Sequence, residues 1–341
     1  MRVGILYNLV DKIESGKELD KLADNEVLDT SLAVKAALER KGHEVFLERV
    51  SPAELKNLKS RYDIIFNLAE GIGSDALEEP KIAEAFEKAG LSFTGAGSKA
   101  LALCLDKAKA KKIMMENGIP TPKYQLIRKL PAKISKELSF PLIIKPVHED
   151  GSIGITSDSV VKDEENLHKK IQEIIEVYKQ PALVEEYIDG REINVALFSN
   201  GHGIQALPLS EVVFEFPEEV PKIVSFDAKW VDDSLLNKNS VGKCPADVPE
   251  HLKEKLIELG KKAYQALGCS DYGRVDFRMK GEEIYALEVN PNPCINPQGA
   301  GFIRSANAAG YSYDDIINKI LMIAVERNKV KQEIKPTPIT V

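Results

Sequence analysis

The stretches RVDF (residues 274–277) and LEVNPNP (287–293) decide how this chain is interpreted. Four polar side chains alternate with apolar ones on what we expect to be two neighbouring strands: Arg274, Asp276, Glu288 and Asn290. Carboxylate and amide oxygens are hard ligands that suit Mg²⁺, which in proteins usually accompanies the phosphates of a nucleotide. An Arg beside them can stabilise negative charge as it develops on an oxygen. The pattern therefore predicts a phosphate-handling enzyme.

The four side chains converge only if the turn between the strands has the right parity. Side chains two residues apart on a strand share a face, as Arg274 and Asp276 do, and as Glu288 and Asn290 do. A two-residue loop near residues 280–282 would send Glu288 to the face opposite Asp276. A three-residue loop, which is a common hairpin form, brings them to the same face. We therefore expect either a loop with an odd number of residues or a bulge in one of the two strands. The alternative is a charged hairpin whose carboxylates are solvated.

Bulk composition is that of an ordinary globular protein. The 341 residues suffice for two or three domains, with 43% hydrophobic and 29% charged residues. The net charge of -7 and the pI near 5.5 argue against a nucleic-acid partner, which usually requires a basic face. They leave ATP open, because its phosphates can be met locally by Lys side chains, Mg²⁺ and backbone N–H groups.

The cysteine spacing, the short apolar runs and the polar start of the N-terminus all fit a reducing cytoplasm. No apolar run reaches the roughly 18 residues of a membrane span, and the N-terminus becomes polar too early for a secretory signal. We therefore expect a cytoplasmic protein with no membrane partner. No C-x-x-C pair joins the four cysteines, which makes a zinc or disulfide framework improbable: Cys104, Cys244, Cys269 and Cys294.

Strand and helix patterns alternate over about the first 95 residues. Residues 3–7, 45–47 and 63–67 are short apolar runs typical of buried parallel strands. Helical spacing precedes Gly42, and a second helix is expected between Pro80 and Gly90. This alternation predicts a doubly wound α/β unit with a parallel sheet.

A predicted strand at 141–146 carries Lys145 and runs into the glycine loop GSIG at 151–154. Backbone N–H groups and the Ser152 hydroxyl of such a loop could wrap phosphates, although the loop taken alone is better explained as an ordinary Gly/Ser turn. Neither a Walker A motif nor G-x-G-x-x-G is present. A P-loop NTPase and a Rossmann dinucleotide site are therefore not supported.

Residues 215–243 are irregular and charged, without a clean period. A long loop over a site and a plain surface insertion explain this segment equally well. Helices are expected from 252 to 268 and from 313 to 325, and the tail, 331–341, is expected to fray.

Taken together, these motifs resemble the ATP-grasp superfamily and, within it, the D-alanine–D-alanine ligase family, from the first strand to about residue 325. The motifs that carry the resemblance are TG (94–95) with DK (106–107), PLIIKP (141–146) with GSIG (151–154), EEYIDGRE (185–192), RVDF (274–277) and EVN (288–290). It implies an α/β (α+β ATP-grasp) fold, in which an N-terminal doubly wound parallel-sheet domain precedes two ATP-grasp subdomains. The implied bounds are 1–98, 99–187 and 188–330, with a tail at 331–341.

The resemblance also implies a set of site residues. ATP would lie between the two ATP-grasp subdomains together with Mg²⁺, or Mn²⁺ in its place. The residues implied to hold the nucleotide are Lys107, Lys145, Gly151, Ser152, Glu185, Glu186, Tyr187, Ile188 and Glu192. Within this set, Glu185 to Ile188 would face the adenine and Glu192 the ribose. The implied metal ligands are Asp276, Glu288 and Asn290. The implied catalytic groups are Arg274, Lys229 and the backbone N–H of Cys294.

The family's activity is ATP-dependent joining of a carboxylate to an amine through an acyl phosphate, which implies small-molecule partners. A homodimer is common in the family and is a possible state of this chain. Departures from the family pattern cluster in the amino-acid pocket and leave the substrate pair unassigned. Gly151 and Gly299 replace Ser, Cys294 replaces Gly, and Trp230 replaces Tyr or Phe. One alternative is a nucleotide-binding protein that has lost catalysis. A nicotinamide-dependent dehydrogenase is disfavoured by the missing glycine fingerprint.

Overall fold

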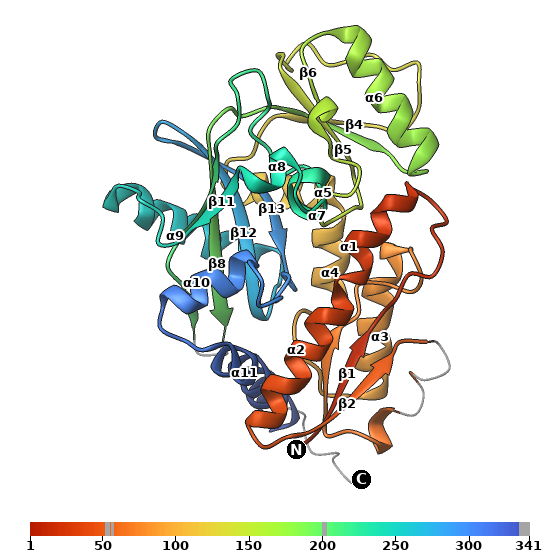
Figure 1. Cartoon of the computed structure of the whole chain (residues 1–341), viewed down its shortest axis with the longest axis vertical. Helices are drawn as coiled ribbons and strands as arrows, with labels where there is room; N and C mark the ends of the chain where they lie inside the picture. Colours follow the sequence, from red (N-terminus) through yellow and green to blue (C-terminus); the bar gives the residue numbers. More distant parts are fainter. Residues whose placement is uncertain (52–54, 56–57, 200–202, 334–341) are drawn as a thin grey trace, which may run out of the picture.

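The computed structural model describes residues 1–51, 55, 58–199 and 203–333, which form three sheets with helices packed around them (Figure 1). The first sheet is parallel, in the order β2-β1-β3, as the N-terminal alternation predicted. Its strands are β1 (Arg2–Tyr7), β2 (Glu44–Arg49) and β3 (Ile64–Leu68).

Helices cover both faces of this first sheet. One core cluster joins the sheet to α2 (Val27–Arg40) and another joins it to α3 (Glu79–Ala89). The α3 helix has Pro80 in its first turn and ends at Gly90 with φ 62°, a left-handed position that glycine adopts without strain. The preceding α1 (Lys21–Asn25) is a short helix. Because the sheet is parallel and has helices on both faces, the predicted doubly wound arrangement is confirmed.

The second sheet is antiparallel, in the order β4-β7-β5-β6, and has a hydrophobic core of its own against α6 (Glu164–Val177). Helices α4 (Ser98–Leu105) and α5 (Lys107–Glu116) lead into this central unit. Its strands are β4 (Tyr124–Ile127), β5 (Leu142–Pro146), β6 (Val160–Val161) and β7 (Ala182–Glu186).

The third sheet is a six-stranded antiparallel sheet in the order β11-β10-β8-β12-β13, with β9 paired to β8. One face packs on α9 (Glu250–Ala266), and the other packs on α10 (Gly301–Ala308) and α11 (Tyr313–Glu333). The strands are β8 (Arg191–Ser199), β9 (Ile204–Ala206), β10 (Ser210–Phe214), β11 (Ser240–Lys243), β12 (Asp271–Lys280) and β13 (Glu283–Asn290).

The β12–β13 hairpin contains the predicted irregularity in the form of a bulge. Lys280 pairs with Glu283 across a two-residue loop, and the register shifts by one residue between Asp276 and Phe277. Leu287 is the extra residue, so Asp276 lies directly opposite Glu288. An unshifted register would place Leu287 opposite Asp276 and turn Glu288 to the other face.

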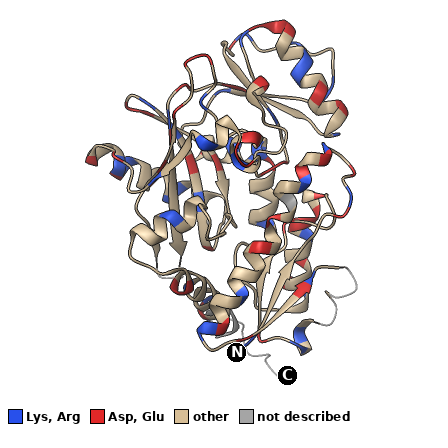
Figure 2. Ribbon diagram, in the orientation of Figure 1, with Lys and Arg blue, Asp and Glu red and all other residues tan. Residues whose placement is uncertain are grey.

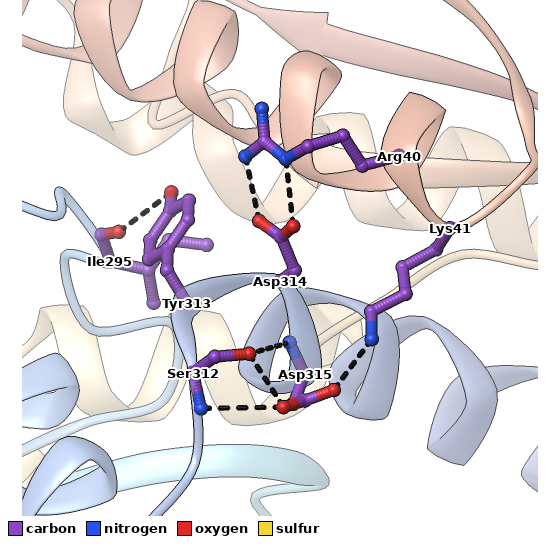
Figure 3. A network of polar contacts seen from close by, with 7 residues as sticks. All are labelled: Arg40, Lys41, Ile295, Ser312, Tyr313, Asp314 and Asp315. Carbon is purple, nitrogen blue, oxygen red and sulfur yellow. Dashed lines mark hydrogen bonds and ion pairs between the residues drawn. The ribbon is translucent and has the colours of Figure 1, made fainter.

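The first and third sheets share one hydrophobic core, which includes Ile5 of β1 and Phe302 of α10. Figure 3 shows α2 tied to the start of α11 by ion pairs from Arg40 to Asp314 and from Lys41 to Asp315. The N-terminal and C-terminal parts are therefore packed as one body, whereas the central sheet packs on a separate core.

Two expectations need revision. Residues 215–243 are not one irregular loop, because they contain α7 (Phe226–Trp230), α8 (Leu235–Lys238) and β11. The last helix extends to Glu333, beyond the predicted end, and the remainder of the predicted tail lies outside the described residues. No helix in the described part of the chain combines the length and hydropathy that a membrane crossing requires. Acidic and basic residues are interspersed over all three parts (Figure 2).

We predict that Arg327→Met destabilises the joined N- and C-terminal body. Arg327 donates to both oxygens of Asp271 at 2.7 and 2.9 Å and to the carbonyl of Phe93 at 2.7 Å. Asp271 is fully buried, so its carboxylate would lose its cation at a cost of about 3–5 kcal/mol. Urea unfolding measures the loss. Arg40→Met, at an exposed ion pair between the same two parts, is the control; an equal loss there would contradict the assignment.

Candidate active site

A cavity with an empty volume of about 710 Å³ lies between the central sheet and the third sheet, and we name it the lysine cavity after Lys107 and Lys145. All nine residues expected to hold a nucleotide line this cavity, although their contacts with ATP stay predictions. Apolar side chains complete its wall and suit an aromatic base: Ile143, Ile155, Val224 and Leu287.

Lys107 stands at the first residue of α5 and is nearly fully buried. Its ammonium lies 2.8 Å from Asp150 and 3.2 Å from Glu288, so it links the glycine loop to β13. Burial opposes its charge, but these two carboxylates raise the pKa of Lys107 above its ordinary value. Lys107 is therefore a fixed cation that can meet a phosphate.

Lys145 is held by a buried ion-pair chain that the sequence did not reveal. Glu185 is 1% exposed and lies between Lys145, at 2.8 Å, and Lys111, at 2.7 Å. Burial alone would raise the pKa of Glu185, but the two ammonium groups hold it below its ordinary value. The Glu185 side chain thus orients Lys145, which leaves the backbone of this segment to face a base.

The chain after Glu185 crosses from the central sheet to the third sheet. Glu186, Tyr187 and Ile188 line the lysine cavity along this crossing. Glu192 follows on β8, where its carboxylate lies 2.9 Å from Arg278 of β12. Burial raises the pKa of Glu192 despite this partner. A ribose hydroxyl could share this carboxylate with Arg278.

The predicted metal ligands meet on one face of the hairpin. Asp276 accepts two bonds from Arg274, at 2.7 and 2.8 Å, and one each from Asn194 at 2.7 Å and Asn290 at 3.0 Å. Glu288, its cross-strand neighbour, lines the lysine cavity. The hard oxygen donors fit Mg²⁺, although Arg274 or Asn290 would have to release an Asp276 oxygen.

The described residues contain no cluster of three or more His, Cys, Asp or Glu side chains that could hold a metal. Beside a nucleotide, Mg²⁺ is held by one or two carboxylates together with phosphate oxygens and water. Asp276 and Glu288 supply those two carboxylates. The residues therefore fit a metal that arrives together with phosphates.

Residues 221–243, which we call the lid segment, lie against the glycine loop. Trp230 donates its indole N–H to the carbonyl of Gly151 at 2.6 Å. The Ser152 hydroxyl donates to the carbonyl of Val224 at 2.7 Å, and a backbone bond joins Phe226 to Ile155 at 2.7 Å. The structure thus favours the loop-over-a-site interpretation over a surface insertion.

A second cavity, with an empty volume of about 950 Å³, adjoins the first and shares Gly151 and Asp150 with it. We name it the arginine cavity, because Arg274 lines it together with Lys229, Asn290 and Cys294. Burial, with the nearby Glu26, raises the pKa of the Cys294 thiol to about 12. A protonated thiol is a poor nucleophile, so only the backbone N–H of Cys294 suits a catalytic role.

Sequence reasoning missed several residues that hold these groups in place. Four polar side chains and one apolar one belong to this set: Lys111, Asp150, Asn194, Arg278 and Leu287. Asn194 and Arg278 lie two residues from predicted ligands on their strands, and that spacing was the available signal. The sequence around Lys111 gave no such signal, because a lysine in a Lys-rich helix ordinarily faces solvent.

A cavity with two fixed lysines and hard oxygen ligands, beside a second cavity that contains an arginine, is the arrangement expected of an ATP-dependent ligase of the ATP-grasp class. Residues 113–322 match the family model described as D-ala D-ala ligase C-terminus. The D-alanine–D-alanine ligase of Carboxydothermus hydrogenoformans is 32% identical over 312 residues, which cover 88% of this chain and 93% of that protein. The chain therefore belongs to the D-alanine–D-alanine ligase family.

Two further matches agree. An uncharacterised protein of Sinorhizobium fredii, y4sG, is 34% identical over 307 residues, which cover 86% of this chain and 87% of that protein. The crystal structure of the Bacillus anthracis D-alanine–D-alanine ligase complexed with ATP has a TM-score of 0.76 at 22% identity, covering 97% of this chain and 99% of that one. The structural match shows the shared fold.

We predict that Glu288 makes stability pH-dependent. Burial would raise its pKa, but Lys107, Lys145 and Arg274 lower it from 4.5 to about 2. Because the folded-state pKa lies below the unfolded-state value, its stabilisation is present above about pH 4.5 and is lost as the pH falls toward 2. The gap in urea-unfolding stability between wild type and Glu288→Gln should narrow over that window. A constant gap would contradict the ion-pair assignment.

We also predict that Trp230→Phe loosens the lid segment. One hydrogen bond contributes about 1 kcal/mol, so tryptic cleavage within 221–243 should accelerate by about fivefold. Limited proteolysis followed by mass spectrometry measures the rate. Leu235→Ala, at an exposed lid residue, is the control. Unchanged cleavage in Trp230→Phe would show that the bond to Gly151 does not hold the lid.

Proposed function

We propose that this chain joins the carboxylate of one amino-acid-like substrate to the amine of another. In the first step a carboxylate oxygen attacks the γ-phosphorus of ATP, and ADP leaves. In the second step the amine attacks the carbon of the acyl phosphate, inorganic phosphate leaves, and the amine loses a proton. The relatives named as D-alanine–D-alanine ligases support this reaction class for a chain of this length and coverage.

One observation carries the proposal: groups suited to phosphate and groups suited to an oxyanion meet where the two cavities join. Lys107, Lys145 and Glu288 line the lysine cavity, and Arg274 lines the arginine cavity beside them. Positioning and charge neutralisation are the main protein contributions to phosphoryl transfer. A γ-phosphate at this junction would meet the substrate carboxylate.

A Mg²⁺ ion held by Asp276, Glu288 and Asn290 would neutralise charge on the phosphates. Arg274 and the Cys294 N–H would donate to the tetrahedral oxyanion of the second step, where one fixed donor contributes about 3 kcal/mol. Lys229 would reach the transferred phosphate from the lid segment. A non-catalytic nucleotide binder would not need the Arg274 group, which is why the ligase is favoured over that alternative.

The expected test is ATP-dependent phosphate release, screened over pairs of D- and L-amino acids, with the product identified by its mass. We predict that Glu288→Gln lowers turnover by about 10²-fold or more, because the phosphates lose a metal ligand. Glu283→Gln, at an exposed position of the same strand, is the matched control.

Full turnover in Glu288→Gln would overturn the metal assignment. Tight ATP binding with no release for any pair would favour the non-catalytic alternative. Cytoplasmic location and a homodimer stay predictions, which fractionation and light scattering can test.

A further inference from the structure

A narrow recess with room for about one water-sized group, such as an ammonium, opens off the arginine cavity, between the N-terminal sheet and the segment around Cys294. We name it the acidic recess. Its walls come from β3, α3 and the start of α2, together with Tyr272 and Ile295. It shares Glu26, Glu70 and Glu79 with the arginine cavity, so the two spaces are continuous.

The ionisable acidic side chains of the recess are not balanced by basic ones among its described lining residues. Glu26, Glu70 and Glu79 line it, and no Lys or Arg is among the described residues that do so. In the arginine cavity the cationic side chains among the described lining residues are Lys229 and Arg274, and Arg274 already holds Asp276. A cation in the recess would therefore face carboxylates on several sides.

The surroundings of Glu79 disfavour the charge of its carboxylate. Burial, followed by the charges of Glu70 and Asp150, raises the pKa of Glu79 well above its ordinary value, against one stabilising hydrogen bond from Asn292. A group that is both cationic and a hydrogen-bond donor would reverse this effect and favour the ionised carboxylate. An ammonium group has both properties.

Asn67 supplies an independent sign that the recess takes a ligand. This side chain lines the recess and is 2% exposed. Its Oδ1 accepts from the Ala69 N–H at 3.3 Å, but its Nδ2 has no hydrogen-bond partner among the described residues. A buried donor without an acceptor costs free energy, so an oxygen from a ligand there would be stabilising.

We propose that the acidic recess selects a dibasic amino acid, with a second ammonium group on its side chain, as one of the two substrates. An amino acid with a neutral side chain brings one ammonium group, its α-ammonium, and leaves nothing cationic on its side chain to enter the recess. A dibasic amino acid brings two, and its carboxylate also provides oxygens that a diamine lacks. The proposal rests on the ligase function above, since it assigns the arginine cavity to the amino-acid substrates.

The test compares ornithine with norleucine, in which a methyl group replaces the terminal ammonium, in both D and L forms. Binding to the full chain in the presence of ADP and Mg²⁺ is measured by calorimetry, and kcat/KM is measured by ATP-dependent phosphate release. We expect ornithine to be preferred by at least about tenfold in one chiral form, the difference that a buried charge pair readily supplies. Equal or better binding of norleucine would overturn the proposal.

Glu79→Gln and Glu70→Gln should each reduce that preference by about tenfold while leaving ATP affinity unchanged. Glu70 is exposed, so Glu70→Gln should fold normally and provides a second test of the recess if Glu79→Gln does not fold. Glu84→Gln, at an exposed position of α3, is the matched control. A preference that persists in both variants would overturn the assignment to the recess.

The two proposals fail in different ways. Preferential ornithine binding without phosphate release for any pair would support the acidic recess and defeat the ligase function. Phosphate release without an ornithine preference would support the ligase and defeat the recess.

Discussion

The bulge at Leu287 is the constraint on which the site depends. Before the bulge, Ile284 and Ala286 of β13 point into the core against α9, and after it Val289 does the same. Only a one-residue shift lets this core remain continuous while Glu288 turns to the face of Asp276. The same shift brings Leu287 and Glu288 into one cavity. One extra residue thus places an apolar side chain and a carboxylate next to each other in the lysine cavity.

Buried charge around the lysine cavity is organised in linked pairs. Glu185 holds two lysines, Lys107 contacts two carboxylates, and Arg274 forks onto Asp276. Pairing offsets the desolvation that isolated charges would suffer. It also fixes each cation before a ligand arrives, and fixed groups need no reorganisation when charge develops during a reaction.

Much of this architecture could be predicted from local patterns. The strand at residues 3–7 is an apolar run bounded by polar residues, and its burial needs no tertiary information. The alternation of side chains required either a loop with an odd number of residues or a bulge between Asp276 and Glu288. It could not decide between the two, because that choice depends on the packing of Ile284 and Ala286 against α9. Lys111 could not be found, since its partner Glu185 is 74 residues away in sequence. The short helices α7 and α8 lack a long apolar face. Trp230 of α7 bonds to the glycine loop, and Asn237 of α8 donates to the carbonyl of Ala228 in α7, contacts that sequence periodicity does not encode.

The division of the hydrophobic cores links the two cavities mechanically. The N-terminal and C-terminal sheets share one core and the buried pair Arg327–Asp271, whereas the central sheet has its own. Residues of the central unit and of the joined body line both cavities, with Gly151 and Asp150 at the boundary. A displacement of the central sheet must therefore change both cavities together. Trp230 bonds to the glycine loop of that sheet, so the lid segment is coupled to the same displacement. The lysine cavity, the arginine cavity and the lid segment are in this way linked through one packing boundary.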